Sequence, residues 1–302
     1  MLSMLCIGFV SCISFFMIQV EGGSLNPHLH LIIDCTDAQT PKRLRTTLDP
    51  LPDRIPLEGL RSLNASGSGQ FSVESLFRVI KKVPFEPSEI VIMDLREESH
   101  GFINKQAISW TDRVHNSANR GRSIAEIEAD EAKRLDVVYE TGRVVLGKKE
   151  SESLEEWSVD SAQTEREVLE SLGFSYVRLP VTDHHRPINE VVDLFVQTIL
   201  TLPENKWIHF HCRGGAGRTS TFFTLYDIMM NCDRVPLEDI LCRQNALGGK
   251  DLTDSNPTSY KYRMAMERLE FVKLFHQYCM ENPGYAISWS EWFHASNNLT
   301  KS

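Results

Sequence analysis

The stretch "HFHCRGGAGRTSTFF", residues 209–223, decides the fold that we expect for this chain. The apolar run "KWIHF" (206–210) is typical of a short buried strand, and "TSTFFTLYDIMM" (219–230) is typical of a buried helix. The glycine-rich turn between them carries one cysteine, Cys212. A strand, a glycine-rich turn and a helix N-terminus in this order form an anion-binding loop. The stretch therefore predicts a phosphate site with a thiol at its centre.

The loop contains the groups that a thiolate needs for attack on phosphate. A helix N-terminus and a nearby cation favour the thiolate form of Cys212. The Arg218 guanidinium offers two parallel donors to phosphate oxygens, and the Thr219 hydroxyl offers a donor to the sulfur. Glycines allow the backbone amides to approach an anion closely. The predicted phosphate-binding loop comprises His211, Arg213, Gly214, Gly215, Ala216 and Gly217.

Alternating segments around this loop indicate an α/β fold with helices packed on a sheet. We expect strands at 89–95, 176–181 and 206–210, and helices at 123–135, 164–174, 188–200, 219–230, 237–249 and 258–281. "VVYETGRVVLG" (137–147) predicts a hairpin that turns at Thr141-Gly142. Residues from about 100 to 158 interrupt the alternation and predict a small partial β-barrel inserted in a single domain, 23–302.

The first twenty residues contain no charged side chain, and the composition changes abruptly at Glu21. This pattern predicts a leader, residues 1–22, and a secreted or periplasmic protein with no stable membrane partner once the leader is removed. An uncleaved membrane anchor, translocation into a host cell and a misassigned start codon are the alternatives. Export would also expose a reactive thiolate at Cys212 to oxidation.

Charge and motif content exclude several classes of function. The net charge of −9 argues against a nucleic-acid partner, because binding to a phosphate backbone needs a positive face. The seven cysteines include no C-x-x-C pair, and the ten histidines form no H-E-x-x-H set, so we expect no metal site. Hydrolysis through a thiolate requires no cofactor, and none is expected.

A second functional residue is expected before the loop. Displacement of an alkoxide from phosphate is slow unless an acid protonates the leaving oxygen. "RLPVTDHHRP" (178–187) places Asp183 just after a predicted strand, 29 residues before Cys212. The intervening helix and strand return the chain to the same sheet edge. The alternative role for Asp183 is to cap the next helix.

"YVRLPVTDH" (176–184) followed by "HCRGGAGRT" (211–219) resembles the PTP-like phytases, or cysteine phytases, of the protein-tyrosine-phosphatase superfamily, whose signature is H-C-x5-R-[ST]. Four further segments are similar to that family: 63–72, 94–110, 163–168 and 237–249. The resemblance implies a protein-tyrosine-phosphatase-like core sheet flanked by helices. It also implies hydrolysis of myo-inositol hexakisphosphate and lower inositol polyphosphates through a phospho-cysteine, with release of inorganic phosphate.

The resemblance also implies roles for individual residues. Cys212 corresponds to the nucleophile, Arg218 to the phosphate clamp, and Asp183 to the acid that later becomes the base. The matches to residues that contact the substrate are Arg45, His184, Lys149 and Lys261. For Arg45 and the two lysines, the alternative is an exposed surface charge.

The segment "GGKDLTDSNPTSYKYR" (248–263) departs from the family, which is richer in lysine there. This difference predicts a smaller contribution to affinity or a preference for less phosphorylated inositols, with Arg186 and Arg213 as compensating cations. A phosphotyrosine or phosphoinositide phosphatase is the first alternative function. A non-catalytic phosphate-binding module is the second, although such a module is expected to lose Cys, Arg or Asp from the site.

Overall fold

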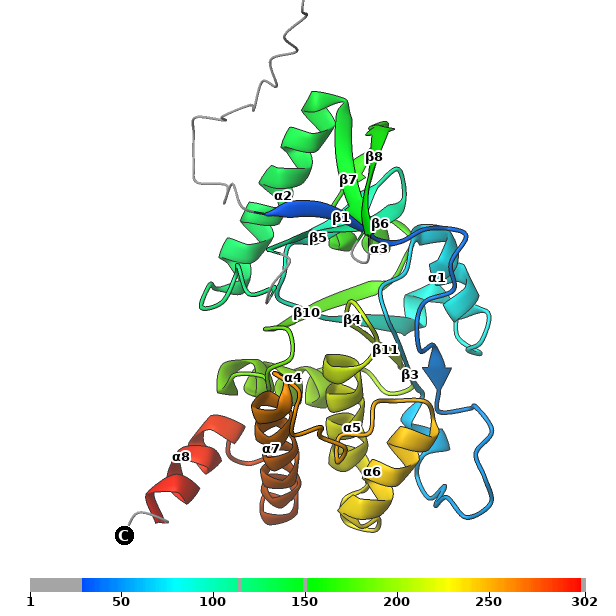
Figure 1. The fold of residues 1–302 in the computed structure, drawn as a ribbon. Coiled ribbons are helices and arrows are strands. Elements are labelled where there is room, and N and C mark those ends of the chain that lie inside the picture. Colours follow the sequence, from blue (N-terminus) through cyan, green and yellow to red (C-terminus); the bar gives the residue numbers. More distant parts are fainter. Residues whose placement is uncertain (1–28, 113–115, 149–150, 300–302) are drawn as a thin grey trace, which may run out of the picture.

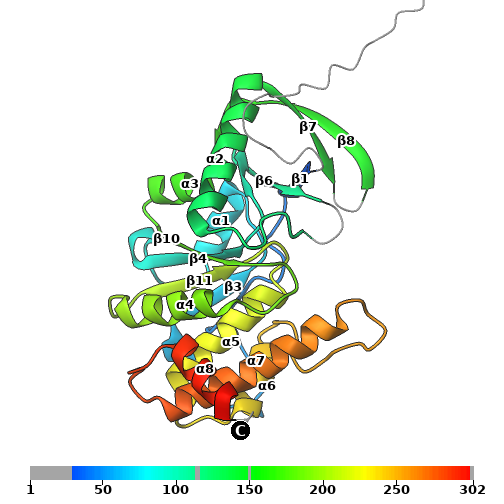
Figure 2. The same cartoon turned by 90° about the vertical axis from the view of Figure 1, so that its left-hand side faces the viewer.

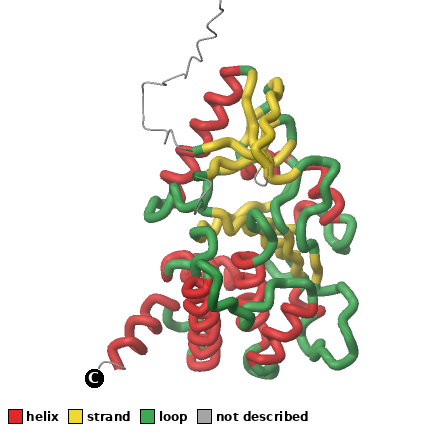
Figure 3. Tube along the Cα trace, in the orientation of Figure 1, coloured by secondary structure: helices red, strands yellow, loops and turns green. Residues whose placement is uncertain are grey.

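The computed structural model describes residues 29–112, 116–148 and 151–299 (Figure 1). The predicted leader, 1–22, and the predicted substrate contact Lys149 lie outside these ranges. Within them, none of the helices combines the length and the apolar character that a membrane crossing requires. Three layers follow one another: a six-stranded sheet, a five-stranded core sheet, and a layer of helices (Figures 1 and 3).

The core sheet has the strand order β10-β4-β11-β3-β2, in which the first four strands are parallel and the short β2 is antiparallel to β3. Its strands are β2 (Arg45–Thr46), β3 (Ala65–Ser68), β4 (Ile90–Arg96), β10 (Ser175–Val181) and β11 (Trp207–His211). Parallel strands place their carboxyl ends along one edge, where ligands bind in α/β sheets. The segments that follow β3, β4, β10 and β11 therefore meet at this edge.

Both faces of the core sheet are covered, which explains why β4 is apolar at successive positions. Val91 and Met93 face the helices α4 (Asn189–Thr201), α5 (Gly217–Asn231), α6 (Leu237–Ala246), α7 (Tyr262–Glu281) and α8 (Trp289–Leu299). Ile90 and Ile92 face the side that holds α1 (Val73–Ile80) and α3 (Glu165–Ser171) (Figure 2). Two short 3-10 helices, Arg61–Leu63 and Pro87–Glu89, precede β3 and β4.

The second sheet has the order β8-β7-β1-β6-β5-β9. Its strands are β1 (His30–Cys35), β5 (His100–Ile103), β6 (Gln106–Thr111), β7 (Arg143–Lys148), β8 (Ser151–Ser158) and β9 (Ala162–Gln163). Helix α2 (Ile124–Thr141) packs on it through Leu135 and Val138. The α/β fold class is confirmed, and among the described residues this sheet stays open rather than closing into a barrel. One of its strands, β1, comes from far before the predicted insertion.

The predicted hairpin at Thr141-Gly142 is wrong. Helix α2 continues through Val137 and Val138, and Gly142 ends it in the left-handed conformation, with φ 68°. A capping box at Ser123 starts the helix, and burial of Leu135 holds its middle. The cooperative formation of a long helix thus outweighs the preference of Val137 and Val138 for a β-strand. An antiparallel strand pair does form near this region, but between the next two segments of the chain, β7 and β8.

A buried ionic cluster joins the two sheets. His100, at the start of β5, lies 3.3 Å from Asp94 and 3.2 Å from Glu165 through its Nε2 atom. The Arg178 guanidinium contacts Glu131 at 2.9 Å and Asp94 at 3.5 Å. Burial lowers the pKa of His100, but the carboxylates of Asp94 and Glu131 outweigh burial and raise it to about 10. His100 is therefore an imidazolium in the folded protein at neutral pH.

This cluster predicts a loss of stability in mild alkali. The pKa of His100 is about 10 in the folded state, above the ordinary value of 6.5, so its contribution is complete below pH 6.5 and disappears as the pH rises toward 10. We expect the free energy of unfolding to fall by about 2 kcal/mol between pH 7 and pH 9 from this residue. Urea titrations at both pH values measure the change. His100→Gln should remove this dependence, and an unchanged slope in the variant would contradict the assignment.

Candidate active site

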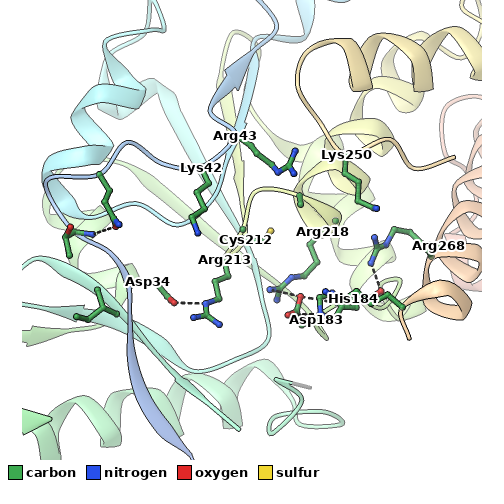
Figure 4. A pocket seen from close by; sticks show the side chains of 18 of the residues that line it. Asp34, Lys42, Arg43, Asp183, His184, Cys212, Arg213, Arg218, Lys250 and Arg268 are labelled. Carbon is green, nitrogen blue, oxygen red and sulfur yellow. Dashed lines mark hydrogen bonds and ion pairs between the residues drawn. The ribbon is translucent and has the colours of Figure 1, made fainter. Parts of the chain in front are cut away.

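A cavity of about 800 Å³ opens at the carboxyl edge of the core sheet (Figure 4). Cys212 follows β11 directly and lines this cavity, although only 3% of the residue is exposed. The Thr219 hydroxyl, in the first turn of α5, donates a hydrogen bond to Cys212 Sγ at 3.1 Å. The thiol thus lies at the N-terminus of a buried helix, as the sequence predicts.

At one position of the glycine-rich turn, Gly215, the backbone conformation and the neighbouring segment leave no room for a side chain. Gly215 has a left-handed backbone, with φ 66°, and a Cβ atom there would lie 2.5 Å from the Gly69 nitrogen. A side chain at 215 would therefore displace the segment that follows β3. Arg213, Gly214, Ala216 and Gly217 also line the cavity. His211 does not, because it ends β11 within the core and places Nε2 2.8 Å from Glu165 Oε1.

The guanidinium of Arg218 is fixed before any ligand binds. Its Nη1 and Nη2 atoms donate to the two carboxylate oxygens of Glu98 at 2.6 and 3.0 Å, and Nη1 also donates to the Val181 carbonyl at 3.1 Å. Burial lowers the pKa of Arg218, but Glu98 and Asp183 outweigh burial and hold it well above its ordinary value. Burial raises the pKa of Glu98, and the arginines reverse this effect and hold it below its ordinary range. The pair therefore stays charged, with a fixed orientation.

Sequence reasoning missed Glu98 as part of the site. The signal was available in its position, because Glu98 stands three residues after the strand predicted at 89–95 and therefore at the edge where the other loops meet. The segment "DLREESHGF" was singled out only for its family resemblance.

Asp183 lies two residues after β10, and its Oδ1 atom is 3.3 Å from Arg218 Nη2. Three contacts hold its loop: Thr182 donates to Glu97 at 3.0 Å, the His184 amide donates to Asp183 Oδ1 at 3.1 Å, and Arg268 donates to the His184 carbonyl. Asp183 therefore lines the cavity beside Arg218, which is the arrangement that its predicted role as an acid requires.

His184 adopts a left-handed conformation, with φ 68°, and lines the cavity next to Asp183. Burial lowers its pKa to about 4, and the cations Lys261, Arg218 and Arg268 add to this effect against the opposing charge of Asp183. The imidazole is therefore neutral at pH 7, so it can offer a ligand in the cavity a hydrogen bond but no charge.

The other predicted substrate contacts differ in their positions. Lys261 lines the cavity from the start of α7. Arg45 does not line it, because the residue is only 1% exposed and donates to the Gly215 carbonyl at 3.0 Å and to Ser220 Oγ at 3.2 Å. Arg45 thus supports the phosphate-binding loop from behind. Arg186 is also turned away from the cavity and stacks near Phe271 and Phe293.

Four cations that sequence reasoning missed also line the cavity: Lys42, Arg43, Lys250 and Arg268. The described lining includes seven basic and three acidic residues, so its charge is opposite in sign to that of the chain. Figure 4 shows that Lys42 and Arg43 reach the site from the N-terminal segment, while Lys250 reaches it from the loop after α6 and Arg268 from α7. The cavity therefore suits a ligand with several negative charges.

Arg268 is expected to contribute to turnover of highly charged substrates. It is 5% exposed and joins the cavity to the Asp183 loop, and burial lowers its pKa to about 10, so it stays charged at pH 7. Loss of a charged hydrogen bond of about 1.5–3 kcal/mol predicts a fall of about 10- to 100-fold in kcat/KM for Arg268→Met. Initial rates test this, with Lys273→Met on the exposed face of α7 as the control. Equal losses in the two variants would contradict the assignment.

Comparisons with known proteins bear on this geometry. The family model of the PTP-like phytases, described as "Inositol hexakisphosphate", matches residues 93–230. This range includes the Asp183 loop, the phosphate-binding loop and Glu98. Among curated proteins, the Effector protein hopD2 of Pseudomonas syringae pv. tomato is 30% identical over 261 residues, which cover 82% of this chain and 55% of that protein.

Two solved structures are similar over most of the chain. The PTP-like myo-inositol phosphatase from Mitsuokella multacida, in complex with myo-inositol-(1,3,4,5)-tetrakisphosphate, is 31% identical with a TM-score of 0.85, covering 91% of this chain and 49% of that chain. A PTP-like phytase from Bdellovibrio bacteriovorus is 33% identical with a TM-score of 0.70, covering 87% of this chain and 94% of that chain. The chain thus spans about half the length of the Mitsuokella chain and of the curated relative.

Proposed function

We propose that this chain, which belongs to the PTP-like phytase family, is a cysteine-dependent phosphatase that removes phosphate groups from inositol polyphosphates. The observation that carries the proposal is the position of Cys212, at a helix N-terminus and at the floor of a cavity lined by cations. Arg218 and Asp183 lie beside each other in the same cavity. This set provides a nucleophile, a phosphate clamp and an acid.

In the first step, the Cys212 thiolate attacks phosphorus in line with the ester oxygen that leaves. The S–P bond forms as the P–O bond breaks, and Asp183 donates its proton to the departing oxygen, so that an alcohol is released. Arg218 and the loop amides stabilise the charge on the equatorial oxygens of the transferred group. Glu98 holds Arg218 in place for this contact.

In the second step, water attacks the phospho-cysteine. Asp183, now a carboxylate, accepts a proton from the water, and the P–S bond breaks to give inorganic phosphate and a thiolate. The Thr219 hydroxyl, 3.1 Å from Sγ, stabilises the sulfur as it leaves. The cycle balances without a metal or a cofactor.

The excess of basic residues supports an inositol polyphosphate as the substrate, because one phosphate occupies the loop while the others require cations around it. Lys42 and Arg43 lie on one side of the cavity and Lys250 on the other (Figure 4), and Lys261 also lines it. We propose that lower inositol polyphosphates are accepted alongside the hexakisphosphate, because residues 248–263 also carry two acids.

A phosphotyrosine substrate is the second candidate, and one observation favours it. Tyr260 is 63% exposed, and its ring lies edge-on to His184 at 6.2 Å. An exposed aromatic ring beside the general-acid loop provides a surface for stacking against a flat leaving group. A phosphotyrosine substrate would leave Lys42 and Arg43, on the N-terminal side of the cavity, without a role.

Turnover on matched substrates tests the proposal. We expect kcat/KM to be highest for an inositol polyphosphate in a panel that also contains a phosphotyrosine peptide and a phosphoinositide. Product profiling of the hexakisphosphate would show successive phosphate losses. A higher kcat/KM for the phosphopeptide would instead establish the second candidate.

For localisation, we propose translocation into a host cell. All five cysteines among the described residues are free thiols, which fits a reducing compartment. Similarity to a bacterial protein named as an effector supports the same alternative. A carboxyl-terminal reporter that works only in host cytosol should give a signal; recovery of the protein only in the culture medium would contradict the proposal.

A further inference from the structure

Arg96 ends β4 beneath the phosphate-binding loop and is fully buried. Its guanidinium contacts three residues from three separate segments. Nη1 lies 2.9 Å from Asp34 Oδ2 and donates to Gln70 Oε1 at 2.6 Å, while Nε donates to Glu98 Oε1 at 2.9 Å. Arg96 is not among the residues that line the cavity.

Two of these partners, Asp34 and Gln70, hold Arg213, the residue that directly follows Cys212. Asp34, on β1 of the second sheet, accepts from Arg213 Nε at 2.6 Å (Figure 4). The backbone N–H of Gln70 donates to the Arg213 carbonyl at 3.1 Å, so Gln70 fixes the backbone of Arg213 where Asp34 fixes its side chain. Arg96 contacts both partners and therefore determines their relative position.

The third partner holds the far end of the loop. Glu98 uses both carboxylate oxygens for Arg218 and shares Oε1 with Arg96. Asp34 and Glu98, together with Gln70, thus form a ring around one guanidinium. The pKa of Arg96 is lowered by burial but raised above its ordinary value by Asp34 and Glu98, so the charge at the centre is permanent.

We propose that Arg96 is a positioning residue for phosphoryl transfer, because it sets Arg213 and Arg218 at the two ends of the loop through Asp34, Gln70 and Glu98. The second sheet thereby takes part in catalysis through β1. A lysine cannot replace this arginine, because one ammonium group on a flexible chain does not reproduce donors at Nε and Nη1 in a fixed plane. The inference rests on the proposed phosphatase chemistry and is independent of the identity of the alcohol.

Arg96→Lys tests this inference, with Arg243→Lys as the matched control. Arg243 is equally buried and forms a two-point pair with Asp227 in the helical layer. Because misplacement of a clamp by about 1 Å costs about 10²-fold, we expect kcat of Arg96→Lys to fall by about that factor, with KM changed much less. The loss should be equal for p-nitrophenyl phosphate and an alkyl phosphate, because the general acid remains in place. Arg243→Lys should lower the thermal midpoint without this fall in kcat.

Binding of inorganic vanadate gives a readout that does not require turnover. Vanadate affinity should weaken in Arg96→Lys and stay unchanged in Arg243→Lys. If the wild type binds vanadate but hydrolyses no phosphate ester, the proposed function has failed, and the vanadate comparison still tests the positioning role. Unchanged kcat and vanadate affinity in a folded Arg96→Lys protein would overturn the inference, as would equal losses in Arg243→Lys.

A second variant separates positioning from folding. Asp34→Asn keeps the shape of the side chain but removes the charge between Arg96 and Arg213. If Arg96 acts on Arg213 through Asp34, the two single substitutions disturb the same contact. The kcat of the double variant Asp34→Asn/Arg96→Lys should then fall by less than the product of the two single losses. If the loss of kcat in the double variant equals that product, Arg96 does not act through Asp34.

Discussion

Cys212→Ser is expected to bind substrate and to lose turnover by at least about 10⁴-fold. A serine hydroxyl is uncharged at neutral pH, and the group hydrogen-bonded at position 212 is the Thr219 hydroxyl, which is not a base. The proposed phosphate contacts should remain, because Arg218 stays paired with Glu98 and Thr219 keeps its contact with the Ser68 carbonyl at the end of β3. Binding by calorimetry and steady-state rates measure the two effects separately.

Cys242→Ser is the matched control, because Cys242 is an exposed free thiol on α6. It should keep the activity of the wild type. Rapid quenching of the wild type with labelled substrate should also trap phosphate on Cys212 and on no other cysteine. Retained turnover in Cys212→Ser would eliminate the thiolate mechanism.

The core of this protein was predictable because its strands and helices are separated by strong local signals. The strand at 206–210 and the helix that follows it are rich in large apolar residues, which favours burial of both. The turn between them contains glycine at Gly215, where the structure permits no side chain. The site follows from these segments, since parallel strands place the phosphate-binding loop and Asp183 at one edge.

The missed residues share a physical cause. Lys42, Lys250 and Arg268 stand in segments without a motif, and a lone cation in sequence is normally solvated. Only the packing of α7 and of the N-terminal segment around one cavity gives these charges a common ligand. Arg45 shows the reverse case: its match to a substrate contact of the family is clear, yet burial behind the loop leaves it no access to the cavity.

The proposed role of Asp183 as the general acid can be distinguished from a structural role, because the contribution of an acid depends on the leaving group. An alkoxide is a poor leaving group and needs a proton, whereas p-nitrophenolate leaves readily without one. We expect Asp183→Asn to slow the hydrolysis of inositol phosphates by about 10²- to 10⁴-fold and that of p-nitrophenyl phosphate far less. Asparagine keeps the shape of the side chain, so the loop contacts of Thr182 and His184 are preserved.

The comparison also separates this role from the alternative in which Asp183 only supports the loop. A loop that has lost its shape would misplace Arg218, whose Nη2 atom lies 3.3 Å from Asp183, and all leaving groups would then slow together. Asp233→Asn, at an exposed position after α5, controls for the loss of one negative charge. Equal slowing of alkyl and aryl substrates by Asp183→Asn would therefore remove Asp183 as the acid. In that case the proton for the leaving group would have to come from another group that lines the same cavity, and neutral His184 would be the next residue to substitute.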